Sequence, residues 1–198
     1  MMKTILSILL LGTVLAQAQT NSTPLKVGDS IPDVTLRTEE NKEVSLQKLV
    51  SEKPTVLIFY RGGWCPYCNR HLQSLVGIED DVNKAGAQLL AISMDQPSKL
   101  RETPNRDKLG YRLFSDSDAN AVKAFGIAFK VDEATVEKYK GYGINLDAAS
   151  GNDHHILPYP AVFIVSTNGV IRFTHVNPDY KVRLEPAKIL EAVRATKN

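Results

Sequence analysis

Residues 55–68 have the sequence TVLIFYRGGWCPYC, a buried-strand pattern that runs directly into a pair of cysteines. The unbroken apolar run at 55–60 combines β-branched and aromatic residues, which is typical of a strand covered on both faces. Gly62 and Gly63 end that strand. Pro66 suits the first position of a helix, so a helix is predicted to begin beside Cys65.

Strands and helices alternate on both sides of this stretch. The helix after Cys65 keeps an apolar spacing until Gly86. Strands are predicted at 88–94 and 113–114, helices at 119–125, 132–139 and 186–195, and a loop or insertion at 141–155. Two hairpins are expected, at 33–37 with 44–46 and at 161–166 with 170–176, the second joined by Asn168-Gly169. This order predicts a central sheet with both parallel and antiparallel pairs.

The first eighteen residues have the pattern of a secretory signal. Lys3 precedes an apolar run at 4–16, and Ala16 and Ala18 place small residues where a signal peptidase cleaves. A membrane anchor is the alternative, but the run is shorter than the roughly 20 residues that span a bilayer. We expect residues 1–18 to be a signal peptide, 19–27 a linker and 28–198 one domain. The protein is then exported, periplasmic or secreted, with no stable membrane anchor after cleavage.

Composition excludes several classes of protein. The chain has 198 residues, 24 basic and 22 acidic, with a net charge of +2 and no basic block. Binding to nucleic acid depends on clustered positive charge, so no nucleic-acid partner is expected. Two cysteines are too few for a fold held together by disulfides.

The spacing of Cys65 and Cys68 is suited to redox chemistry. The reactive form of cysteine is the thiolate, and the partial positive charge at a helix N-terminus favours it. Cys68 lies about one turn further along the same helix face, within reach of Cys65. The two sulfurs are therefore able to alternate between a dithiol and a disulfide.

Three other interpretations of the cysteine pair remain open. A structural disulfide would close a very short loop, which stabilises a fold little. A metal site would need histidines as further ligands, yet their spacing matches no zinc pattern. An inert buried pair is the third. The histidines are His71, His154, His155 and His175. No metal and no cofactor are expected.

The stretch VLIFYRGGWCPYCNRHL resembles the active-site region of the peroxiredoxin-like branch of the alkyl hydroperoxide reductase/thiol-specific antioxidant superfamily. LPYPAVFIVSTNGVIRFTHVNPDY is similar to the second half of that superfamily, and the resemblance covers about residues 25–196. It implies an α/β, thioredoxin-like fold: a central mixed sheet flanked by helices, with an N-terminal hairpin extension. It also implies a thiol peroxidase that reduces hydroperoxides and is recycled by a thioredoxin-like reductant or by client protein thiols.

The resemblance also implies roles for individual residues. Cys65 would attack the peroxide and Cys68 would resolve the product. Pro160 matches a proline that thioredoxin-like proteins hold in the cis form opposite the active site. A cis bond there would turn the backbone of Tyr159 toward the cysteines.

The active-site stretch departs from the usual peroxiredoxin pattern. Ile58 and Gly62 stand where a proline and a threonine or serine are usual, and the usual late arginine is missing. Arg61 is expected to supply positive charge to Cys65 instead, with a solvated strand end as the alternative. Trp64 and Tyr67 are expected to shield the site from water, or simply to pack.

Weaker signals stand outside this stretch. Asp116 and Asp118 are expected to cap the helix at 119–125. Asp95 follows a strand, where site residues often lie in open α/β sheets. Asp153-His154-His155 is interpreted as part of a surface loop, with a metal or acid–base role as the alternative.

Two further functions compete with the peroxidase. One is a protein thiol–disulfide oxidoreductase that acts by mixed-disulfide exchange, which Pro66, Tyr67 and Pro160 suit equally well. The other is a binding module without catalytic activity that keeps the fold and a structural disulfide.

Overall fold

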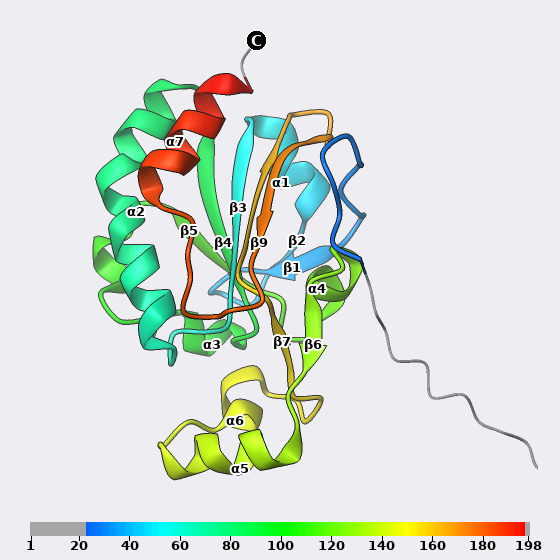
Figure 1. Cartoon of the computed structure of the whole chain (residues 1–198), viewed down its shortest axis with the longest axis vertical. Helices are drawn as coiled ribbons and strands as arrows, with labels where there is room; N and C mark the ends of the chain where they lie inside the picture. Colours follow the sequence, from blue (N-terminus) through cyan, green and yellow to red (C-terminus); the bar gives the residue numbers. More distant parts are fainter. Residues whose placement is uncertain (1–22, 197–198) are drawn as a thin grey trace, which may run out of the picture.

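A computed structural model describes residues 23–196 and contains a seven-stranded mixed sheet (Figure 1). The strand order is β2-β1-β5-β4-β3-β8-β9. Its strands are β1 (Thr35–Arg37), β2 (Glu43–Ser45), β3 (Thr55–Tyr60), β4 (Gln88–Ser93), β5 (Arg112–Ser115), β8 (Ala161–Val165) and β9 (Ile171–Val176). The central strand β3 is parallel to β4 and antiparallel to β8. The expected mixed sheet is confirmed.

Helices cover both faces of this sheet because β3 is apolar on both sides. Leu57 and Phe59 point into the core shared with α1 (Leu46–Glu52) and α4 (Asn120–Ala124). Ile58 and Tyr60 point into the opposite core, shared with α2 (Pro66–Lys84) and α7 (Pro186–Ala195). Figure 1 shows α2 and α7 side by side on one face.

Both expected hairpins are present. β1 pairs with β2 in an antiparallel register. β8 also pairs with β9 in an antiparallel register. Gly169 in the connecting turn has φ of +81°, a conformation that glycine adopts without strain. The bounds of β3 and α7 match the sequence prediction, and α2 ends two residues before Gly86.

A small extension projects from the sheet at the bottom of Figure 1. It consists of a two-stranded sheet, β6 (Ala128–Lys130) with β7 (Ile156–Pro158), and the helices α5 (Glu133–Gly141) and α6 (Leu146–Ser150). Residues 141–155, predicted to be a loop or an insertion, belong to this extension and contain the helix α6. The Asn145 side chain caps α6 by accepting from the Ala148 N–H, Leu146 is buried, and Gly151 ends the helix with φ of +75°.

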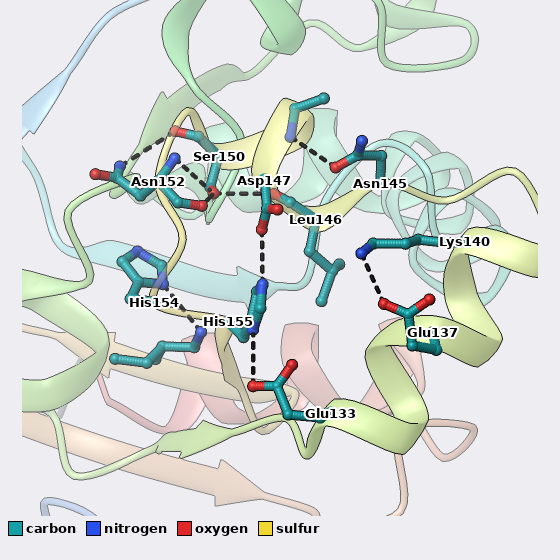
Figure 2. A network of polar contacts seen from close by, with 12 residues as sticks. Glu133, Glu137, Lys140, Asn145, Leu146, Asp147, Ser150, Asn152, His154 and His155 are labelled. Carbon is teal, nitrogen blue, oxygen red and sulfur yellow. Dashed lines mark hydrogen bonds and ion pairs between the residues drawn. The ribbon is translucent and has the colours of Figure 1, made fainter.

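Two histidines fasten this extension (Figure 2). His155 Nε2 lies 2.7 Å from Asp147 Oδ1, and its Nδ1 lies 3.7 Å from Glu133 Oε1, so the ring bridges α6 and α5. His154 accepts from the Ile156 N–H at 2.9 Å and donates to the Ser117 carbonyl at 2.8 Å. Residues 23–196 contain no cluster of three or more His, Cys, Asp or Glu side chains arranged to hold a metal.

Two short elements follow β4: the helix α3 (Pro97–Leu100) and a 3₁₀ turn at Arg106–Lys108. Asp116 caps α4 as expected, because its carboxylate accepts from the backbone N–H groups of Ala121 and Val122. The expected cap from Asp118 was wrong, because its side chain accepts no hydrogen bond from α4. None of the helices in the described part of the chain is long and apolar enough to cross a membrane. The expected signal peptide lies outside the described residues.

Residues 177–185, which we call the strap, connect β9 to α7. In Figure 1 they run along the lower end of the main sheet, above the extension, before turning up into α7. His71 Nε2 on α2 lies 3.1 Å from the Leu184 carbonyl oxygen, and the ring of Tyr67 packs edge-on against Tyr180 with centroids 5.6 Å apart. The strap is therefore fixed to the beginning of α2.

Candidate active site

The two cysteines lie where β3 passes into α2. Cys65 is the N-cap of α2, and its sulfur accepts from the Cys68 N–H at 3.4 Å. Pro66 occupies the first turn, as predicted. The two sulfurs are unlinked, and Cys65 and Cys68 are only 2% and 0% exposed. A protein-sized partner has no direct access to either sulfur in this conformation.

The turn before Cys65 requires glycine at Gly62. A Cβ atom there would lie 2.4 Å from Trp64 Nε1 and 2.5 Å from Asp95 Oδ1, far inside contact distance. The next residue, Gly63, donates its N–H to Asp95 Oδ2 at 2.6 Å, and Asn69 Nδ2 donates to the Gly63 carbonyl at 2.7 Å. These contacts fix the approach of the chain to the cysteines.

Arg183 of the strap contacts the sulfur of Cys68. Its Nη2 lies 3.3 Å from Cys68 Sγ, while its Nη1 donates to the carbonyls of Tyr180 and Val182. Burial alone would raise the pKa of the Cys68 thiol. The hydrogen bond from Cys65 and the charge of Arg183 outweigh burial, so that the pKa of Cys68 is lowered from its ordinary value.

The pKa of the Cys65 thiol shifts in the opposite direction. The hydrogen bond that its thiol gives to Cys68, followed by burial, raises the pKa of Cys65 above its ordinary value. Arg183 is within hydrogen-bond distance of Cys68. In this arrangement the charge of Arg183 favours the thiolate form of Cys68.

Arg61 is at the site, but its guanidinium is directed elsewhere. It donates to Tyr139 Oη at 2.9 Å and stacks on the ring of Tyr180, 4.1 Å from the centroid. The backbone N–H of Arg61 contributes to lowering the pKa of Cys68. The side chain thus braces the strap and the extension, and the charge nearest the sulfur comes from Arg183.

The aromatic residues line two sides of the cysteine pair. Trp64 packs against Tyr139 with centroids 5.8 Å apart and borders a hollow of about 320 Å³ that also includes Asp95. Tyr67 faces the strap, and Arg70 stacks over its ring at 4.8 Å.

The prediction of a cis bond before Pro160 was wrong, because residues 23–196 contain no cis peptide bond. The Tyr159 N–H donates to the Ile127 carbonyl, and the Pro160 carbonyl accepts from the Asn177 N–H. These bonds carry the extended pairing from β7 into β8. The ring of Tyr159 stacks on Phe129. Because the Tyr159 N–H already donates to Ile127, it is not available to a substrate chain.

Asp95 lies behind the turn as a buried carboxyl. Burial, and then the charge of Cys68, raise the pKa of Asp95 to about 7, against the lowering effect of the Gly63 N–H. Its Oδ1 has no hydrogen-bond partner among the described residues. Asp95 lines the same hollow as Trp64.

Sequence analysis missed Arg183 and His71. Burial lowers the pKa of His71 to about 4, so the ring is neutral at pH 7 and donates from Nε2 to Leu184. Arg183 is separated from Cys68 by 115 residues and belongs to no local motif. No signal in the sequence identifies it.

A mixed sheet with a buried cysteine pair at the start of a helix defines a thioredoxin-fold protein with a dithiol site. The pattern of the AhpC/TSA family matches residues 27–174, and the chain belongs to that family. The expected family and fold are thereby confirmed.

Individual relatives agree with this assignment. Peroxiredoxin Bcp of Escherichia coli (strain K12) is 31% identical over 104 residues, which are 52% of this chain and 66% of that protein. Peroxiredoxin Q, chloroplastic, of Suaeda salsa is 28% identical over 150 residues, 76% of this chain and 59% of that protein. The chain thus spans slightly less than two thirds of the length of these relatives.

Solved structures show the same fold. The crystal structure of peroxidoxin BcpB from Mycobacterium tuberculosis matches with a TM-score of 0.68 at 19% identity, covering 88% of this chain and 99% of that one.

Proposed function

We propose that this protein is a thiol peroxidase that reduces hydroperoxides with Cys65 and Cys68 and is recycled by an external thiol donor. The observation that carries the proposal is the contact of Arg183 Nη2 with Cys68 Sγ at 3.3 Å, next to the second thiol. A lowered thiol pKa supplies the thiolate that peroxide chemistry needs at neutral pH. The family supports the same reaction.

In the proposed reaction Cys68 is the attacking sulfur. Its thiolate attacks one peroxide oxygen, the O–O bond breaks, and the leaving oxygen takes a proton to become water or an alcohol. Cys68 is then a sulfenic acid, two electrons more oxidised. Cys65 condenses with it, so that an S–S bond forms and the hydroxyl leaves as water with the Cys65 proton. The sequence expectation gave the attack to Cys65, and the position of Arg183 favours exchanging the two roles.

The burial of the sulfurs supports a small substrate over a protein disulfide. Thiol–disulfide exchange requires access to the attacked sulfur. Both sulfurs are buried, Arg183 of the strap contacts Cys68, and the Tyr159 N–H is already used within the fold. These features favour the peroxidase over the protein thiol–disulfide oxidoreductase, which we keep as the second candidate.

Trp64 allows both the activity and the roles to be tested, since it is the only tryptophan and adjoins Cys65. Reduced protein is mixed with hydrogen peroxide by stopped flow and its fluorescence is followed. We expect a fast first phase that Cys65→Ser retains and Cys68→Ser loses, and a second phase that both variants lose. The reverse pattern would give the attack to Cys65. A rate no faster than that of free cysteine would refute the peroxidase.

We also propose that the protein is exported. The tripartite pattern of residues 1–18 supports this. Expression of the full chain, fractionation of the cells and N-terminal sequencing of the product test it. A mature chain that begins at Gln19 outside the cytoplasm is expected, and an uncleaved cytoplasmic chain would contradict it.

A further inference from the structure

Among the described residues, some arginines of this protein pair with a carboxylate, and others have no carboxylate partner. Nine arginines lie in residues 23–196, and five of them have a carboxylate oxygen within 4.0 Å. The four without one are Arg61, Arg70, Arg172 and Arg183. Of these four, Arg183 contacts Cys68, Arg61 stacks on Tyr180 and Arg70 stacks on Tyr67. Arginines without a carboxylate partner therefore gather at the beginning of α2 and the strap.

A hollow of about 290 Å³ opens between α2 and the strap at this place, and we call it the basic hollow. Arg70, Lys181 and Arg183 line it together with neutral His71. Within the described residues, no carboxylate lies within 4.0 Å of the charged nitrogens of these three basic side chains. Its one acidic lining residue, Glu185, is exposed at the rim of α7.

The charge of the basic hollow depends on the redox state of the cysteines. In the dithiol form the Cys68 thiolate neutralises Arg183. When Cys65 and Cys68 join in a disulfide, that negative charge disappears, and Arg183 has no anionic partner. Nη2 of a partly buried guanidinium that has lost its anionic partner favours an incoming carboxylate.

We propose that the basic hollow binds the carboxylate of a small anionic thiol, which is the reductant of the disulfide form. This inference rests on the proposed function only in requiring a Cys65–Cys68 disulfide. The bound thiolate attacks Cys65 Sγ, the Cys65–Cys68 bond breaks, and its electron pair leaves on Cys68. A second thiolate attacks the mixed disulfide and releases the oxidised thiol, and Cys65 takes a proton from water. The restored Cys68 thiolate pairs with Arg183 again, so Arg183 binds the carboxylate of the reductant less tightly.

The test compares thiols that differ in charge. The disulfide form is prepared with diamide, so that the experiment does not depend on peroxidase activity. Its reduction by 3-mercaptopropionate, 2-mercaptoethanol and cysteamine is followed by Trp64 fluorescence, with rates expressed per thiolate. We expect the anionic thiol to react about three- to ten-fold faster than the neutral one, since each partly exposed charge contributes modestly. The cationic thiol is expected to be slowest.

Variants connect the preference to the basic hollow. Arg70→Ala and Lys181→Ala are each expected to lower the preference about two- to three-fold, and the double variant to abolish most of it. Lys84→Ala is the matched control, because Lys84 is an exposed cation at the other end of the same helix. High salt is expected to remove the preference in the parent protein, because it screens charges at an exposed surface.

A second arm asks whether the carboxylate belongs instead to the peroxide. The reduced protein is mixed with linoleic acid hydroperoxide and with its methyl ester. Little discrimination is expected, because the Cys68 thiolate occupies Arg183 in this form. Equal rates for anionic and neutral thiols, a preference that survives the double variant, or a carboxylate preference confined to the peroxide arm would each overturn the proposal.

Discussion

Replacing Arg183 by methionine removes the positive charge beside Cys68 while keeping a side chain of similar length. Two unit charges 3.3 Å apart attract by about 5 kcal/mol at an effective dielectric constant of about 20. Solvent and relaxation reduce this, and a neighbouring opposite charge typically lowers a pKa by about one to three pH units. We therefore expect Arg183→Met to raise the pKa of Cys68 by about that amount.

The measurement uses a Cys65→Ser background, in which the serine hydroxyl replaces the thiol as a donor to Cys68. The ultraviolet absorbance of the thiolate is followed against pH, with a variant lacking both cysteines as the blank. Arg183→Lys keeps the charge on a shorter reach and is expected to give an intermediate pKa. The reaction with hydrogen peroxide at neutral pH is expected to slow about ten-fold in the methionine variant. An unchanged pKa in Arg183→Met would refute the reasoning.

Three further predictions concern the surroundings of the site. Because burial raises the pKa of Asp95 to about 7, its contribution to stability is full at low pH and is lost as pH rises through that value. From about pH 5 to about pH 8 the free energy of unfolding of the parent is expected to fall by about 2–3 kcal/mol relative to that of Asp95→Asn, measured by urea unfolding. Parallel pH profiles of the two proteins would contradict this. Gly77→Ala, at an exposed position of α2 with nothing within 4 Å of the new Cβ, is expected to stabilise by about 1 kcal/mol, whereas Gly62→Ala must displace Trp64 or Asp95 and is expected to cost about 1–3 kcal/mol. Tyr180→Ala removes the ring under Arg61 and is expected to raise alkylation of the cysteines by a bulky maleimide about ten-fold, an effect absent if the strap opens freely in the parent.

The sequence predicted those parts of the fold whose signals are local. β3 is a continuous apolar run, and its bounds follow from that run alone. The hairpin at Asn168-Gly169 follows from turn chemistry, and the start of α2 follows from Pro66. Strands β6 and β7 have three residues each, too few for a period to emerge.

The missed parts of the site depend on contacts between distant segments. The form of the bond before Pro160 is set by the pairings of Tyr159 and Pro160 with the strands around them, which a local motif does not contain. Arg183 has ordinary neighbours in the sequence, and only the path of the strap carries it to Cys68. The location of the sulfurs was thus predictable, whereas the distribution of charge between them was not.

The order in which a ribosome makes this chain gives the strap a further consequence. Both cysteines are synthesised well before Arg183, because Cys68 precedes it by 115 positions in the chain. Only the last helix, α7, follows the strap. Until the strap docks, Cys68 has no guanidinium beside it and keeps the sluggish reactivity of an ordinary thiol. The contact that lowers the pKa of Cys68 therefore forms only after the chain has been made past residue 183 and the strap has reached α2.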